Sequence, residues 1–181
     1  MPEQISQSVR ARAAKIRVLV LDVDGVLTDG SLYLGDNGVE YKAFYSRDGH
    51  GMKLLMASGV QVAVITGRRS QLVADRMAAL GVTHVYQGDD RKGPIFDALL
   101  KTLDLEPTQA AYVGDDLVDL PVMARCGLAV AVADADPRVV HRASFTTRCA
   151  GGRGAVREVC ELILDAQGKL DAALAPWLAT P

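Results

Sequence analysis

The chain has 181 residues, of which 49% are hydrophobic and 23% charged, a balance typical of a folded globular protein. Lys and Arg number 20 and Asp and Glu number 22, so the formal net charge of −2 shows no sign of nucleic-acid binding. No apolar run approaches the roughly 20 residues of a membrane span, and residues 1–14 carry no signal-peptide core. The three cysteines lack metal-ligand spacing, which favours reduced thiols. We therefore expect a cytoplasmic protein that binds neither nucleic acid nor membrane.

The chain begins with a polar lead-in over residues 1–16 that contains a helical patch over residues 9–15. Apolar runs then predict strands, over residues 17–22, 60–65, 82–87, 110–113, 128–132 and, at the sheet edge, 145–147. Helical patterns lie between and after these strands, over residues 47–57, 71–80, 95–103, 117–126, 136–143 and 155–166. This alternation predicts an α/β fold with a three-layer, Rossmann-like parallel sheet. We expect one domain over residues 1–181, with a core of about 15–166 and a C-terminal tail over 167–181.

A β-hairpin interrupts the first strand-to-helix crossover. Residues 31–34 and 39–44 read as two short strands around a Gly/Asp/Asn turn. The hairpin holds six apolar residues, which are Leu32, Tyr33, Leu34, Val39, Tyr41 and Phe44. Two short strands cannot bury so many by themselves, so we expect them to lie in a subunit interface.

Polar clusters follow four of the predicted strands: Asp22 with Asp24, Thr66 with Gly67, Asp89 to Lys92, and Asp115 with Asp119. Ligands of a parallel sheet bind where its strands end, so the four clusters should converge on one edge. Each cluster also has a plainer interpretation: a turn for Thr66–Gly67, a helix cap for Gly114–Asp116, a solvated helix start for Lys92. Their coincidence favours a functional site.

Several carboxylates that face one another repel unless a cation lies between them, and Mg2+ prefers oxygen ligands of this kind. Lys92 adds a fixed positive charge, Thr66 a hydroxyl, and Gly67 a backbone N–H that a ligand can approach closely. Such a cradle suits a phosphoryl group. One carboxylate can act as the nucleophile and form an aspartyl-phosphate, while another serves as acid and base.

The motifs resemble those of the haloacid dehalogenase superfamily of phosphohydrolases. They comprise the Asp22–Thr28 run, Thr66–Arg68, Lys92 and the Gly114–Asp119 run. Further stretches over residues 28–30, 47–51, 92–94 and 151–158 resemble one branch, the 3-deoxy-D-manno-octulosonate 8-phosphate phosphatases, which act in lipopolysaccharide biosynthesis. The resemblance covers roughly residues 15–166 and implies hydrolysis of that sugar-acid phosphate with Mg2+ as cofactor.

The resemblance also implies a role for each matching residue. Asp22 would be the nucleophile and a metal ligand, and Asp24 the acid/base and a ligand through its backbone carbonyl. Asp115 would be the third ligand. Asp119 would orient metal-bound water or Lys92, and Asp116 would support the ligands without binding the metal. Thr66 and Lys92 would hold the phosphoryl group beside Gly67. Arg68 and Arg76 would face the anionic substrate.

The spacing between motifs leaves no room for a cap domain. Only the hairpin and one helix separate Asp22 from Thr66, and only a helix and a strand separate Thr66 from Lys92. A phosphoryl-transfer site needs shielding from bulk water, so we expect another subunit to cover it. Members of the branch are tetramers, and the resemblance implies a homotetramer here.

A Gly-rich segment, residues 151–157, offers two more candidate substrate contacts. Arg153 and Arg157 are one helical turn apart, and a doubly anionic sugar acid needs more positive charge than Lys92, Arg68 and Arg76 supply. Solvated arginines at a helix start are the alternative.

Two other functions stay open at this point. One is a phosphatase for a related nonulosonate 9-phosphate. The other is a non-catalytic regulatory module, which the presence of Asp22, Asp24 and Lys92 together disfavours.

Overall fold

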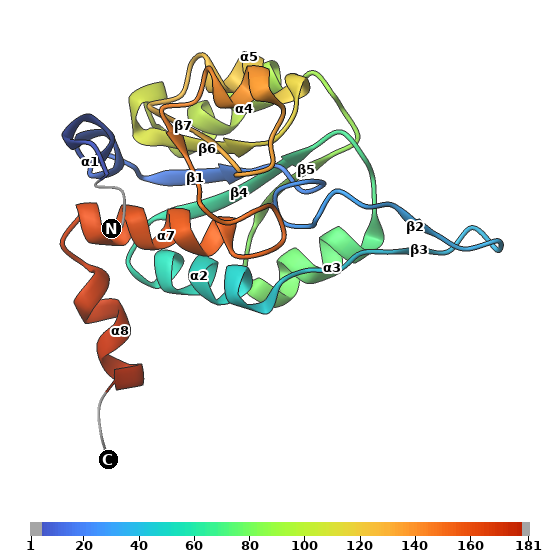
Figure 1. Cartoon of the computed structure of the whole chain (residues 1–181), viewed down its shortest axis with the longest axis horizontal. Helices are drawn as coiled ribbons and strands as arrows, with labels where there is room; N and C mark the ends of the chain where they lie inside the picture. The colour runs from blue at the N-terminus through green and yellow to red at the C-terminus, as the bar shows by residue number, and fades with distance from the viewer. Residues whose placement is uncertain (1–4, 179–181) are drawn as a thin grey trace.

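A six-stranded parallel sheet forms the centre of the protein (Figure 1), in a computed structural model that describes residues 5–178. The strand order is β5-β4-β1-β6-β7-β8. The strands are β1 (Val18–Leu21), β4 (Gln61–Thr66), β5 (His84–Gln87), β6 (Ala110–Gly114), β7 (Leu128–Ala131) and β8 (Phe145–Thr146). From β1 the chain adds β4 and then β5 on one side. It then returns to the other side of β1, where it adds β6, β7 and β8 in turn. The carboxyl end of β1 is therefore the point where the strand order reverses, which is where ligands bind in such sheets.

Helices cover both faces of the sheet, because alternate residues of each strand point to opposite faces. Leu19 and Leu21 of β1 pack with α1 (Gln7–Ala13), α2 (Ser46–Ala57), α3 (Gln71–Leu80) and α7 (Ala155–Ala166). Val18 and Val20 pack with α4 (Lys92–Leu103), α5 (Leu120–Met123) and α6 (Pro137–Val140). Figure 1 shows α2, α3 and α7 on one side of the sheet and α4 and α5 on the other. The predicted three-layer α/β fold is confirmed, and no separate cap domain appears within residues 5–178.

The predicted hairpin is present but shorter than expected, with strands β2 (Tyr33–Leu34) and β3 (Glu40–Tyr41). It projects from the body of the molecule (Figure 1). Five of its six apolar residues are exposed, which are Leu32, Tyr33, Leu34, Val39 and Tyr41. Phe44 differs: it lies where the hairpin joins the body, and it packs against the core.

The two ends of the chain also differ from expectation. The first helix begins and ends two residues earlier than the predicted patch, because the Ser6 hydroxyl accepts a hydrogen bond from the Val9 backbone N–H and caps it. The tail contains a helix that the sequence pattern did not predict, α8 (Leu170–Leu178), which extends away from the sheet (Figure 1). Within residues 5–178, no helix has the length and apolarity needed to cross a membrane.

Candidate active site

Three carboxylates gather at the carboxyl ends of β1 and β6. Asp22 follows β1, Asp115 follows β6, and Asp119 ends the short 3-10 helix η2 (Leu117–Asp119). One oxygen from each lies within 4.8 Å of the others. They meet because β1 and β6 are adjacent and Leu21 pairs with Val113, so both strands end at the same level.

Lys92 supplies the positive charge within this cluster. It is the first residue of α4, and its side chain is only 1% exposed. Its Nζ lies 3.0 Å from Asp22 Oδ1 and 2.7 Å from Asp119 Oδ1. Burial opposes the charged form of Lys92, but the attraction of Asp22 and Asp119 outweighs it and raises the pKa of Lys92. Lys92 is therefore charged at neutral pH.

Asp119 acts as an anchor, since both of its oxygens already accept hydrogen bonds. Oδ1 accepts from Lys92 Nζ and from the Tyr112 hydroxyl, both at 2.7 Å. Oδ2 accepts from the backbone N–H groups of Asp115 at 2.9 Å and Asp116 at 3.2 Å. Asp119 thus holds Lys92 and the loop after β6, in keeping with the supporting role expected for it.

Asp115 is less satisfied. Its Oδ1 is buried and has no hydrogen-bond partner among residues 5–178. Burial, with repulsion from Asp119 and Asp22, raises the pKa of Asp115 to about 7. Burial likewise raises the pKa of Asp22 to about 6, although Lys92 opposes the shift. The single positive charge of Lys92 is too little to keep both Asp22 and Asp115 fully ionised in this buried cluster.

A divalent cation fits this arrangement. Asp22, Asp115 and Asp119 together with Lys92 carry two net negative charges when all are ionised. The donors are hard oxygens, and the unpartnered Asp115 Oδ1 is a free ligand atom. The Asp115 carboxylate packs closely against the backbone of Gly25, whose φ is 91°. Only glycine permits this contact, because a Cβ at position 25 would lie 2.0 Å from Asp115 Oδ2.

The Asp24 carboxylate lies outside the cluster of three. It is joined to the Lys42 ammonium by an ion pair, and its Oδ2 is 3.7 Å from Arg68 Nε. The side chain is 19% exposed, so it faces the opening of the site more than Asp22 does. The metal role implied for Asp24 concerns its backbone carbonyl, and its carboxylate is held by Lys42 and Arg68.

Thr66 and Gly67 lie at the end of β4, the other neighbour of β1. Thr66 is 3% exposed, and its carbonyl accepts a hydrogen bond from the Gly88 backbone N–H at 3.0 Å. A Cβ at Gly67 would lie 1.8 Å from Asp90 Oδ1. Because Gly67 has no side chain, the loop after β4 can lie directly against Asp90 in the loop after β5. Asp116 instead caps η2, where its Oδ1 accepts from the Leu117 backbone N–H at 2.7 Å.

The four predicted substrate-binding arginines occupy three different environments. Arg68 lies at the site opening, 46% exposed, with Nη2 2.9 Å from Glu40 Oε1. Arg153 Nη2 lies 3.3 Å from Asp29 Oδ2, just beyond the nucleophile loop. Arg76 lies against Gly49 of α2. Arg157 lies over Gly51 at the α2–α7 contact, with Nε 2.6 Å from Glu161 Oε1.

A profile for haloacid dehalogenase-like hydrolases matches residues 81–159. The chain is 57% identical over 169 residues to the 3-deoxy-D-manno-octulosonate 8-phosphate phosphatase KdsC of Escherichia coli strain B / BL21-DE3, covering 93% of this chain and 90% of that one. The crystal structure of the corresponding phosphatase from Yersinia pestis is 55% identical and superposes with a TM-score of 0.90, covering 91% of this chain and 89% of that one.

The chain belongs to the KdsC family of haloacid dehalogenase-like phosphatases. It is therefore a phosphoric monoester hydrolase. The Moraxella catarrhalis KdsC-family phosphatase, 41% identical with a TM-score of 0.92 over 93% of this chain and 97% of that one, was crystallised with a magnesium ion, a phosphate ion and a KDO molecule.

Four residues that contact predicted site residues were given no individual role from the sequence: Glu40, Lys42, Asp48 and Tyr112. Glu40 lies in β3 and Lys42 directly follows it, two residues along, and this spacing in extended chain is the available signal that both face the same side. Tyr112 lies inside an apolar strand, so its sequence context predicts a core aromatic residue and gives no sign that its hydroxyl bonds to Asp119. Asp48 lies in the first turn of α2, where an exposed residue is the usual expectation.

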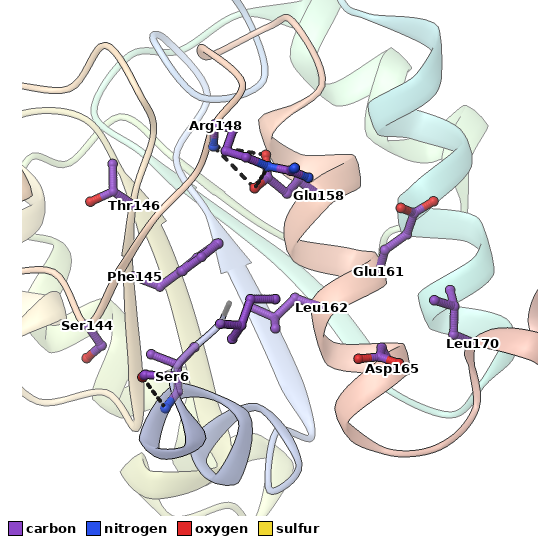
Figure 2. Close-up of a pocket in the computed structure, with 12 residues that line it drawn as sticks. Ser6, Ser144, Phe145, Thr146, Arg148, Glu158, Glu161, Leu162, Asp165 and Leu170 are labelled. Atoms are coloured by element: carbon purple, nitrogen blue, oxygen red, sulfur yellow. Dashed lines mark hydrogen bonds and ion pairs between the residues drawn. The ribbon is translucent and has the colours of Figure 1, made fainter. Parts of the chain in front are cut away.

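The cavity shown in Figure 2, of about 520 Å3, lies away from the carboxylates. It is bounded by α1, β8 and α7, and its lining includes Ser6, Phe145, Arg148 and Glu158. Arg148 and Glu158 form an ion pair with each other, with Nε 3.3 Å from Oε1. None of the predicted site residues lines this cavity, which therefore takes no part in the phosphatase site.

Proposed function

We propose that this protein hydrolyses 3-deoxy-D-manno-octulosonate 8-phosphate to 3-deoxy-D-manno-octulosonate and inorganic phosphate, with Mg2+ as its cofactor. One observation carries the chemistry: buried Lys92 and the carboxylates of Asp22, Asp115 and Asp119 share one strand-end cluster that fits a divalent cation. The substrate rests on the KdsC relatives, which match the chain over 93% of its length. The same relatives support a place in lipopolysaccharide biosynthesis.

Each residue of the cluster has a proposed role. Asp22, Asp115 and the backbone carbonyl of Asp24 would hold Mg2+, which when bound would neutralise negative charge on the phosphoryl oxygens and on the carboxylates. Lys92, Thr66 and Gly67 bind the phosphoryl group. Asp119 orients Lys92, supported by the 2.7 Å distance between them, and Asp116 fixes the loop as the cap of η2.

The reaction proceeds in two displacements. An Asp22 carboxylate oxygen attacks phosphorus, the bond from phosphorus to the sugar oxygen breaks, and the Asp24 carboxyl gives its proton to that leaving oxygen. Asp24, now ionised, takes a proton from water while the water oxygen attacks phosphorus. The bond to Asp22 then breaks and releases phosphate. The Asp24 position outside the metal cluster and nearer to solvent supports this division of labour.

The carboxylate of the sugar acid needs a cationic partner. The four predicted arginines differ in how well their positions suit them for this contact. Arg68 at the opening and Arg153 beside Asp29 are the better placed within one subunit. Arg76 and Arg157 lie against α2, and a substrate contact by either requires a change of rotamer.

The proposed working unit is a cytoplasmic homotetramer in which the whole chain, residues 1–181, acts as one domain with a core of about 15–166. The exposed hairpin supports the assembly, because apolar side chains such as Leu34, 70% exposed, gain by burial against a second copy. A neighbouring subunit would then cover a site that this chain leaves without a lid.

Phosphate release by wild type and by Asp22→Asn tests the chemistry. The wild type should turn over the octulosonate phosphate with Mg2+ and lose activity with a chelator. Asp22→Asn should fold and be inactive, because an amide is a poor nucleophile and a weaker metal ligand. Turnover by Asp22→Asn at more than about one hundredth of the wild-type rate contradicts the aspartyl-phosphate mechanism. A wild type that prefers a nonulosonate 9-phosphate contradicts the proposed substrate alone.

A further inference from the structure

Lys42 is a buried cation whose partner is the proposed acid/base. It directly follows β3 at the base of the hairpin, and its side chain is only 2% exposed. Its ammonium donates to Asp24 Oδ1 and lies 3.2 Å from Glu40 Oε1. A buried ammonium without partners is costly, so these two carboxylates fix where the Lys42 side chain lies.

The two oxygens of Asp24 have different surroundings. Oδ1 accepts from buried Lys42, whereas Oδ2 is 3.7 Å from Arg68 Nε, on a side chain that is 46% exposed. Arg68 also binds Glu40, with Nη2 2.9 Å from Oε1. Lys42 and Arg68 therefore alternate with Asp24 and Glu40 in one network, in which the Lys42 side chain is buried and the Arg68 side chain is exposed to solvent.

This asymmetry matches what a carboxylic acid needs in order to donate a proton in one direction. A protonated carboxyl has one oxygen that only accepts and one that carries the hydrogen. The buried Lys42 ammonium occupies Oδ1 as a hydrogen-bond acceptor, which leaves Oδ2, beside the half-exposed Arg68 side chain, as the oxygen that can face the substrate. Proton transfer depends strongly on such alignment.

We propose that Lys42 is a positioning residue that holds Asp24 with Oδ2 directed at the leaving oxygen of the substrate. The proposal rests on the acid role of Asp24 in the proposed function and adds a residue outside the catalytic set. It also gives the base of the hairpin a direct connection to the chemistry, through Lys42 and Glu40.

The test compares two esters that differ in their need for an acid. An alkyl phosphate, such as the sugar-acid phosphate or glycerol phosphate, leaves as an alkoxide and needs the proton. The p-nitrophenyl ester leaves as a stable phenolate and does not. Because kcat/KM covers only the steps up to formation of the phosphoenzyme, it isolates the proton donation by Asp24.

Lys42→Met should lower kcat/KM for the alkyl ester about ten- to a hundredfold and for the aryl ester less than about threefold. Asp24→Asn should show the same selectivity with a larger loss. Lys42→Arg should recover part of the alkyl activity, and Lys101→Met, on an exposed lysine of α4, should match the wild type. Each ratio is measured on one protein sample, so partial misfolding cancels; if Lys42→Met is insoluble, Lys42→Gln replaces it.

Equal losses on the two esters, or none, overturn the positioning role and leave Lys42 as a structural ion-pair partner. If Asp24→Asn itself shows no selectivity, the acid role of Asp24 is wrong and the Lys42 proposal falls with it. A wild type that does not turn over the octulosonate phosphate contradicts only the proposed substrate, because glycerol phosphate still tests Lys42.

Discussion

At the scale of single residues, the site combines charges that only a cation can balance. Lys92 neutralises the charge of one of the three clustered carboxylates. The oxygens of Asp119 accept hydrogen bonds from Lys92, Tyr112 and the backbone of the loop after β6. Asp22 and Asp115 are left with raised pKa values because burial disfavours their ionised forms. The metal-free protein should therefore be sensitive to pH.

We predict that the metal-free protein loses stability as pH rises from about 5 to about 7.5. Asp22 and Asp115 have folded-state pKa values of about 6 and about 7, above the ordinary 3.8. The folded state thus binds more protons than the unfolded state in this range, and stability falls with rising pH. The depressed pKa values of Asp29, Asp89 and Asp136 act only below about 4.

Thermal unfolding in a chelator checks this, with a drop in Tm on the order of 5 °C expected across that range. Asp115→Asn should flatten the dependence because it removes one of the two titrating groups. Saturating Mg2+ should shrink or reverse it, since the metal binds the ionised carboxylates. A metal-free Tm that rises with pH would contradict the raised pKa values.

At the scale of elements, α2 and α7 are joined by a buried carboxylate. Gly154 precedes α7 and has no side chain to cap it. Asp48 of α2 takes that place: it accepts from the backbone N–H of Gly154 at 3.3 Å and of Arg157 at 2.8 Å. The adjoining Gly151–Gly152 segment packs directly on the loop after Asp22, where the Gly152 N–H donates to the Val26 carbonyl at 2.9 Å. Asp48 therefore supports the loop after Asp22 through the start of α7.

Asp48→Ala should destabilise the protein by about 1–3 kcal/mol, because it leaves buried N–H groups without an acceptor. At about 2–4 °C per kcal/mol for a protein of this size, Tm should fall by roughly 3–10 °C. Asp48→Asn keeps one acceptor oxygen and should cost less. Asp171→Ala, on an exposed position of α8, is the matched control. Wild-type stability in Asp48→Ala would show that the cap contributes nothing.

At the scale of the whole molecule, the hairpin is the feature that a single chain does not explain. Leu34 and Tyr41 are 70% and 64% exposed on an element that projects from the body (Figure 1). Water contact with such side chains is unfavourable, at about 25 cal/mol per Å2 of apolar surface. In the proposed tetramer, burial between subunits would remove that surface and bring a neighbour close to the base of the hairpin, where Lys42 pairs with Asp24.

We predict that Leu34→Lys disrupts the proposed tetramer, because a charge placed in the proposed hairpin interface would have to be desolvated. Sedimentation should show smaller species, and kcat/KM should fall about tenfold or more as the site loses its cover. Leu178→Lys serves as the control, since Leu178 is 75% exposed on α8, a different element. Dissociation by Leu178→Lys but not by Leu34→Lys would place the interface elsewhere.

Local sequence was enough to predict the parallel sheet, the helices that cover it and the polar residues that stand at its carboxyl edge. The reason is physical: buried parallel strands read as apolar runs, and Asp22, Thr66, Lys92 and Asp115 each stand at the end of a strand or the start of a helix. The helix α8 escaped prediction because Ala-rich sequence without a strong apolar stripe carries a weak signal.

Only the tertiary structure decided which groups satisfy one another. Asp119 binds Tyr112 and Lys92, Asp48 caps a helix more than 100 residues away, and Lys42 reaches Asp24 across the hairpin. No local pattern encodes these pairs, because hydrogen-bond partners distant in sequence are selected by how the elements pack. The sequence by itself determined the chemistry at the sheet edge, and the packing of the hairpin and α7 determined how that chemistry is held in place.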